Sequence, residues 1–146
     1  MKFDVIVGNP PYQVNTGGSG RQAKPIYQEF ILQAKEMQPR YLVMIIPARW
    51  YAGGFGLEDF RKSMLNDKHI KNLVDFESAT SVFPGVDIAG GVCYFLWDRE
   101  YEGNCCIINN RQKEEPHTNV RPLNEFDILV RDSRALSILR KALSSD

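Results

Sequence analysis

The sequence predicts an α/β fold, with a sheet of about four main strands, mostly parallel with one antiparallel strand, flanked by helices. Two almost wholly apolar runs, residues 3–7 and 41–47, enclose a segment with helical spacing. Strand, helix and strand in this order are typical of a parallel βαβ unit whose strands are buried. Two more apolar runs, 71–77 and 91–97, are joined by a connection too short for a crossover helix. We therefore expect these two strands to be antiparallel.

Helices are predicted where apolar residues recur every three or four positions. Pro25 suits a first helical turn and begins a helix over residues 25–38. Its apolar stripe is predicted to be Ile26, Phe30, Ala34 and Met37, widened by Ile31 and Leu32. Tyr27 is predicted to be a core or rim aromatic residue. A second helix covers residues 57–66, with Leu57, Phe60, Met64 and Leu65 inward. Beyond residue 100 the pattern indicates a strand over 103–109, a polar loop over 111–122, and a helix over 131–143 with one leucine side.

Length and composition fit a single soluble domain. The 146 residues are 43% hydrophobic and 25% charged, which is ample for a core and ordinary for a soluble protein. The sequence has no run of about 18 apolar residues and no secretory signal, so we expect no membrane span and a cytoplasmic location. Three cysteines without metal-ligand spacing favour a reduced compartment over a disulfide scaffold or a zinc site.

The charge balance excludes a protein that coats DNA over its whole surface. The net charge is zero, yet residues 1–50 carry six Lys and Arg against three Asp and Glu. Residues 51–100 carry five against eight. The positive third surrounds the segment Gly8–Tyr12, where a phosphate backbone could pass.

The segment after the first strand is the strongest functional signal in the sequence. The strand over residues 3–7 runs directly into Gly8-Asn9-Pro10-Pro11-Tyr12. Each proline fixes φ and removes a backbone donor, and the residue before a proline is held in extended geometry. The side chain of Asn9 and the nearby carbonyl groups are therefore held stiffly at the carboxyl end of a strand, which is where ligands bind in open α/β sheets.

Asn9-Pro10-Pro11-Tyr12 after such a strand resembles the catalytic motif of amino-methyltransferases that use S-adenosylmethionine. The succession from this motif through Ile45-Ile46-Pro47 to Val82-Phe83-Pro84-Gly85 and the last apolar strand is similar to adenine-specific DNA methyltransferases, in particular to the methylase domain of type IIG restriction–modification enzymes. The similarity covers residues 3–99. It implies a partial Rossmann-like methyltransferase sheet, with its antiparallel strand inserted beside the strand that ends at Pro47. It also implies methylation of adenine in DNA within a restriction–modification system.

The residue types suit this chemistry. An exocyclic amine conjugated to a purine is planar and a poor nucleophile. The amide oxygen of Asn9 and the carbonyl of Pro10 can each accept one amine hydrogen, which draws the nitrogen toward tetrahedral geometry. Tyr12 offers a flat face on which an extruded base can stack. By the resemblance, Asn9, Pro10, Pro11 and Tyr12 are the catalytic motif, and Phe83 falls where the family often places an aromatic residue near the flipped base.

Four other residues are candidates for substrate binding. Arg21 and Lys24 lie in or beside a glycine-rich loop that is either a lid with cations for phosphates or an ordinary solvated loop. Arg49 and Trp50 follow the second strand, where Arg49 could contact phosphate and Trp50 could line the base pocket. A surface arginine and a packing aromatic are equally good interpretations of this pair.

The chain departs from the family pattern in its cofactor site. Members bind S-adenosylmethionine with a glycine-rich turn upstream of the motif, and only two residues precede the motif's strand here. We therefore expect residues 1–100 to be the catalytic half of a methyltransferase domain, and residues 101–146 to be an extension leading toward an absent target-recognition region. The open edge of the first strand is expected to be covered by a missing amino-terminal cofactor half, by another chain or by a dimer mate.

Two alternatives remain open at this stage. Families that methylate a glutamine side chain or an RNA base share the motif, although glutamine methyltransferases usually place a Glu-Pro and a long glycine loop before the next helix. This chain runs instead into Pro25-Ile26-Tyr27-Gln28-Glu29-Phe30, which favours DNA. A non-catalytic interaction module that uses the open sheet edge is the second alternative.

Overall fold

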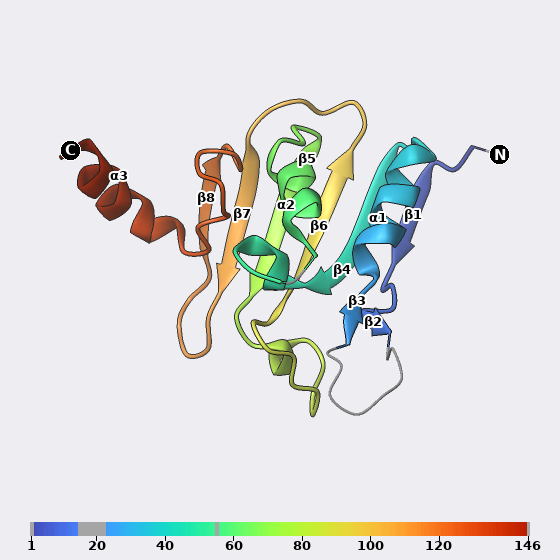
Figure 1. The fold of residues 1–146 in the computed structure, drawn as a ribbon, viewed down its shortest axis with the longest axis horizontal. Helices are drawn as coiled ribbons and strands as arrows, with labels where there is room; N and C mark the ends of the chain where they lie inside the picture. Colours follow the sequence, from blue (N-terminus) through green and yellow to red (C-terminus); the bar gives the residue numbers. More distant parts are fainter. Residues whose placement is uncertain (1, 15–22, 55, 146) are drawn as a thin grey trace.

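The computed structural model describes residues 2–14, 23–54 and 56–145 (Figure 1). These residues form a six-stranded sheet in the order β1-β4-β6-β5-β7-β8 and a separate two-stranded ribbon, β2-β3. The strands are β1 (Val5–Gly8), β2 (Gln13–Val14), β3 (Lys24–Pro25), β4 (Tyr41–Pro47), β5 (Ile70–Phe76), β6 (Val92–Asp98), β7 (Cys105–Asn110) and β8 (His117–Arg121). The helices are α1 (Tyr27–Glu36), α2 (Glu58–Leu65) and α3 (Leu136–Ser144), with 3-10 turns η1 (Ala48–Tyr51), η2 (Ala79–Ser81) and η3 (Ser133–Ala135).

Four of the six strands run in the same direction, as the sequence predicts, although three of the five pairings are antiparallel. Strands β1 and β4 are parallel, and so are β5 and β7. Strand β6 runs antiparallel between β4 and β5, which confirms both the expected antiparallel pair and the insertion beside the strand that ends at Pro47. The α/β fold class is therefore confirmed.

The predicted strand over 103–109 is β7, and one strand that was not predicted, β8, lies beside it as a second antiparallel strand of the sheet. The predicted polar loop over 111–122 contains β8, which pairs antiparallel with β7. Three of the five β8 residues are exposed. An edge strand can be held by backbone hydrogen bonds to one neighbour, so its sequence needs no apolar alternation.

Helix α1 buries part of the predicted apolar stripe and leaves its outer residues exposed. Tyr27, Ile31 and Ala34 are its buried residues, whereas Phe30 is 46% exposed and Met37 45% exposed. The helix begins after Pro25, which pairs with Gln13 in the β2-β3 ribbon. The predicted stripe is wider than the face that one helix can bury, and the docking of the helix on the sheet decides which of its residues are covered.

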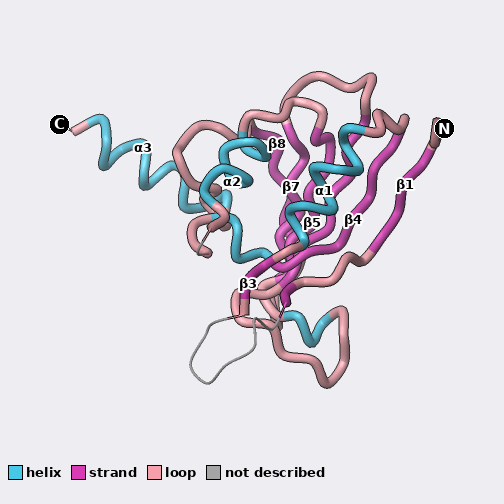
Figure 2. Tube along the Cα trace, turned by 45° about the vertical axis from the view of Figure 1, so that its right-hand side comes forward, coloured by secondary structure: helices cyan, strands magenta, loops and turns pink. Residues whose placement is uncertain are grey.

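Helices α1 and α2 lie on the same face of the sheet, and the main core fills the layer between (Figures 1 and 2). The predicted inward residues of α2 (Leu57 at its start, Phe60, Met64 and Leu65) are all buried. The opposite face carries no helix among the described residues, so the first strand is less buried than expected. Val5 is 52% exposed, Val7 70% and Tyr94 39%.

The carboxyl-terminal helix leads away from the sheet (Figure 2). The predicted helix over 131–143 begins only at Leu136, after the short turn η3. The expected leucine side is Leu136, Leu139 and Leu143. Leu136 is buried, but Leu139 is 36% exposed and Leu143 61% exposed, so most of this side does not pack on the described domain. None of the described helices is long and apolar enough to cross a membrane.

Candidate active site

A large cavity of about 1170 Å³ opens at the edge of the sheet where β1 and β4 end. It exceeds the usual size of a small-molecule site, which runs from roughly 300 to 1,000 Å³. The motif forms one wall, the β2-β3 ribbon with the start of α1 a second, and the segments after β4 and before β6 the rest. The lining residues are Asn9, Pro10, Pro11, Tyr12, Gln13, Ala23, Lys24, Pro25, Tyr27, Gln28, Pro47, Arg49, Gly54, Gly56, Leu57, Asp87, Ile88 and Ala89.

The motif begins where β1 comes close to β4. A Cβ on Gly8 would lie 3.0 Å from Met44 Sδ, so glycine permits this approach. After it, Asn9 is exposed while Pro10 is buried. Among the described residues, no hydrogen bond uses the Asn9 side chain or the Pro10 carbonyl. Two acceptor oxygens are thus available at the cavity.

Tyr12 is anchored rather than mobile. Its carbonyl accepts a hydrogen bond from the Ile26 N–H at 3.2 Å, and its ring meets Tyr27 edge to face at 6.4 Å between centroids. Its hydroxyl is buried and has no partner among the described residues. Burial, with a smaller contribution from Cys93, raises the pKa of Tyr12. The side chain is therefore neutral at physiological pH, as an ordinary tyrosine is, and its ring lines the cavity.

Two of the predicted phosphate-binding cations reach the cavity. Lys24 lines it from β3 and Arg49 from η1, and both are exposed. Asp87 is the only carboxylate among the described lining residues. Arg21 lies outside the described residues, so its predicted role has no structural counterpart.

The two predicted aromatic residues do not line the cavity. Trp50 is fully buried in the core, where its ring meets Tyr51 at 4.9 Å and Phe60 at 5.9 Å. Trp50 is therefore a packing residue of the core, which is one of its two predicted roles. Phe83 is half-buried and follows η2, where its N–H donates to the Ala79 carbonyl at 2.8 Å. Neither residue is among the described residues that line the cavity.

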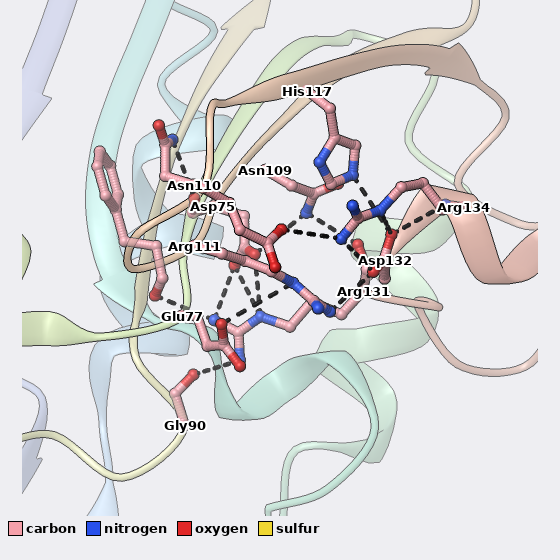
Figure 3. Close-up of polar contacts among 12 residues, drawn as sticks. Asp75, Glu77, Gly90, Asn109, Asn110, Arg111, His117, Arg131, Asp132 and Arg134 are labelled. Atoms are coloured by element: carbon pink, nitrogen blue, oxygen red, sulfur yellow. Dashed lines mark hydrogen bonds and ion pairs between the residues drawn. The ribbon is translucent and has the colours of Figure 1, made fainter.

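Sequence reasoning missed a polar cluster beside the cavity. Asp75 is 3% exposed on β5 and pairs with Arg131 at 2.9 Å (Figure 3). A signal was present, because a single carboxylate stands in the apolar run Leu73-Val74-Asp75-Phe76, and a buried carboxylate requires partners. The partner is 56 residues away in sequence, and nothing local identifies it. No group of His, Cys, Asp and Glu suited to a metal occurs in the described ranges.

The fold is similar to that of chains solved from type I restriction–modification systems. A chain solved in work on complex assembly and conformational transition of the type I restriction–modification system aligns over 75% of this chain and 24% of its own length, with a TM-score of 0.56 and 17% identity. The methyltransferase subunit of a type I restriction–modification system from Streptococcus thermophilus aligns over 99% of this chain and 32% of its own, with a TM-score of 0.52 and 12% identity.

The sequence comparison identifies the family. A model of the Eco57I restriction–modification methylase family matches residues 1–83, so the chain belongs to this family. A protein of Mycoplasma pneumoniae described as an uncharacterised adenine-specific methylase is 40% identical over 123 residues, which is 82% of this chain. The chain spans 29% of the length of that relative.

Proposed function

We propose that this chain carries the catalytic part of a methyltransferase that modifies the exocyclic amine of adenine in DNA, within a restriction–modification system. The observation that carries the proposal is the pair of acceptors at Asn9 and Pro10, which no described residue engages in a hydrogen bond and which lie at a large cavity with Tyr12. Membership of a restriction–modification methylase family supports it.

The motif would act on the amine by position and charge. The Asn9 amide oxygen and the Pro10 carbonyl each accept one N–H of the target amine, and the nitrogen lone pair then points away from the purine ring. Acceptors held by two prolines need little reorganisation during the reaction, which is the condition for electrostatic preorganisation. S-adenosylmethionine supplies the electrophilic methyl group when it is bound. The amine loses its extra proton to solvent after transfer.

The other cavity residues suit a DNA substrate. Lys24 and Arg49 are exposed cations on different walls and can contact phosphates on either side of an extruded nucleotide. Arg21 is proposed for the same role from its position in sequence. The Tyr12 ring supplies the stacking surface, since base extrusion leaves a π-face without a neighbour.

The described residues suit binding of the target amine better than binding of S-adenosylmethionine. The cavity holds the motif, but no strand in the described ranges is followed by a glycine-rich turn and an acidic ribose-binding position. We propose that a cofactor-binding segment adds a strand to the free edge of β1 and covers the bare apolar face around Val5, Val7 and Tyr94. Parallel sheets are normally covered on both faces, which favours such an occupant.

Identification of the product tests the activity. The natural polypeptide that contains these residues, with any subunit it requires, is incubated with methyl-labelled S-adenosylmethionine and either unmethylated duplex DNA, RNA or a glutamine-containing peptide. We expect label only in DNA, as N6-methyladenine after digestion and mass spectrometry. Label in RNA or peptide, or none at all, would reject the DNA reading.

Calorimetry tests the division of the cofactor site. S-adenosylmethionine is titrated into the isolated 146-residue chain, and we expect no detectable binding because the proposed cofactor segment is not part of it. One-to-one binding would mean that these residues build the cofactor site without a glycine-rich turn. The partition between two segments would then be wrong, even if the reaction is correct.

A further inference from the structure

A buried carboxylate beside the cavity gathers donors from three separate parts of the chain (Figure 3). Asp75 accepts hydrogen bonds from the Tyr51 hydroxyl at 2.8 Å and from Asn109 Nδ2 at 3.2 Å. Arg131 Nε lies 2.9 Å from Oδ2, and its Nη2 lies 2.9 Å from Oδ1. The carboxylate is therefore fully partnered by groups on η1, on β7 and on the carboxyl-terminal segment.

Arg131 also contacts the segment that adjoins one wall of the cavity. Its Nη1 donates to the Gly90 carbonyl at 2.6 Å and its Nη2 to the Phe76 carbonyl at 3.0 Å. Gly90 directly follows the cavity-lining residues 87–89. Gly90 and Gly91 have φ of +86° and +78°, which is a left-handed backbone conformation that glycine adopts easily. Because glycines have many accessible backbone conformations, contacts from other parts of the chain are needed to hold this segment in one of them.

A second contact ties the same carboxyl-terminal segment to the opposite wall. The Leu129 N–H donates to the Tyr51 carbonyl at 2.8 Å, and Tyr51 ends the turn η1 that also carries Arg49. The two walls are joined directly as well, since the Ala48 N–H donates to the Gly91 carbonyl at 3.1 Å. Residues 129–131 thus reach both walls that face the motif.

We propose that Arg131 is a positioning residue, which fixes the cavity walls at residues 48–51 and 87–91 relative to the motif through Asp75 and the Gly90 carbonyl. The consequence for catalysis rests on the proposed function. The role requires a planar guanidinium, because one side chain must reach a carboxylate and two carbonyl groups in different directions. The same contacts couple the carboxyl-terminal segment, which continues into η3 and α3, to the cavity.

Hydrogen exchange on this chain tests the positioning role without any activity. Arg131→Lys keeps the charge beside Asp75 but cannot make the three contacts together. We expect amide exchange in residues 86–91 and 48–53 to rise at least tenfold, while global unfolding stays cooperative. Arg134→Lys is the matched control, because Arg134 is on the same segment but is exposed and contacts only Asp132 and Glu114. Unchanged exchange at both walls in folded Arg131→Lys would overturn the proposal.

A second variant covers the case in which Arg131→Lys does not fold. Asp75→Asn combined with Arg131→Met removes both charges together, so no buried ion is left without a partner. We expect the same local rise in exchange at the two walls. If the double variant folds and its amides at both walls are protected as in the wild type, the walls keep their conformation without Arg131 and the proposal is wrong.

Kinetics separate positioning from mere stability. In the natural polypeptide, at a temperature where Arg131→Lys is fully folded, we expect kcat to fall at least tenfold and Arg134→Lys to keep the wild-type value. A structural role alone would lower the melting temperature and leave kcat unchanged, which would overturn the link to catalysis. If wild-type protein transfers no methyl group, the proposed function fails, whereas the exchange result still decides the positioning role.

Discussion

The motif segment on β1 and the Asp75–Arg131 cluster lie at the same edge of one sheet, yet they are built in opposite ways. Strand β1 has one neighbour, and its motif leaves the Asn9 side chain and the Pro10 carbonyl without hydrogen-bond partners among the described residues. Asp75 is on a strand with neighbours on both sides, and several donors meet its carboxylate.

The difference shows two ways of making a polar group rigid. Asn9 and Pro10 are held by backbone constraints, because their prolines fix the chain without using the acceptor oxygens. Asp75 is held by contacts that use its oxygens fully, so it has nothing left for a substrate. A group that acts on a ligand needs the first arrangement, and a group that supports a wall needs the second.

The largest effect on stability is expected from Asp75→Ala. The change leaves the Arg131 guanidinium and the Tyr51 hydroxyl without their main acceptor in a buried place. We expect a loss of about 4 kcal/mol in the free energy of unfolding, measured by urea denaturation. Asp87→Ala, at an exposed aspartate on the cavity wall, is the control and should change stability by less than about 0.5 kcal/mol. If Asp75→Ala and Asp87→Ala lowered the free energy of unfolding equally, the buried contacts of Asp75 would not support the wall as described.

The reverse behaviour is expected from Asn9→Ala. We expect kcat for methyl transfer to fall about 100-fold or more, because one preorganised acceptor is lost, with the unfolding free energy unchanged because the side chain is exposed. Asn119→Ala, at an exposed asparagine of β8, should change neither quantity. Undiminished turnover in Asn9→Ala would refute the motif's mechanism.

Gly85 and Gly91, on either side of the cavity wall at residues 87–89, allow a comparison of an open and a crowded position. A Cβ at Gly91 would lie 2.1 Å from the Phe76 carbonyl oxygen, whereas a Cβ at Gly85 has nothing within 4 Å. Both have positive φ, near +80°. We expect Gly91→Ala to destabilise by about 2 kcal/mol more than Gly85→Ala, because only the former adds overpacking to backbone strain. Matched thermal unfolding of the two variants measures this difference.

The smallest effect concerns the outer part of the cluster. A hydrogen bond from Arg134, together with backbone and charge contacts, lowers the pKa of Asp132 to about 2. The stabilisation is therefore present above the unfolded pKa of about 3.9 and is lost as pH falls through 2. We expect Asp132→Asn to cost about 1 kcal/mol at pH 7 and nothing below pH 2, in denaturant titrations at several pH values. Asp127→Asn, at an exposed site, should show no such pH dependence.

Local sequence was sufficient for part of this molecule. The apolar run 41–47 matches β4 in both bounds, and the short connection between 71–77 and 91–97 correctly predicts an antiparallel pair. The stiffness around Asn9 follows from Pro10 and Pro11 alone. Strand β8 could not be predicted, because an edge strand needs no apolar pattern. For α1 the sequence predicted a broad apolar stripe, and only the packing decided that Ile31 and Ala34 are buried while Phe30 is exposed.

The sequence by itself determined the apolar strands of the sheet, their main directions and the motif, because apolar periodicity and proline geometry act over a few residues. Tertiary structure alone decided which aromatic residues reach the cavity and which enter the core, as Tyr12 and Trp50 show. It also decided that Asp75 meets Arg131. Such pairings depend on packing between segments that are far apart in the chain, and a buried charge selects its partner only once the fold brings that partner within hydrogen-bond reach.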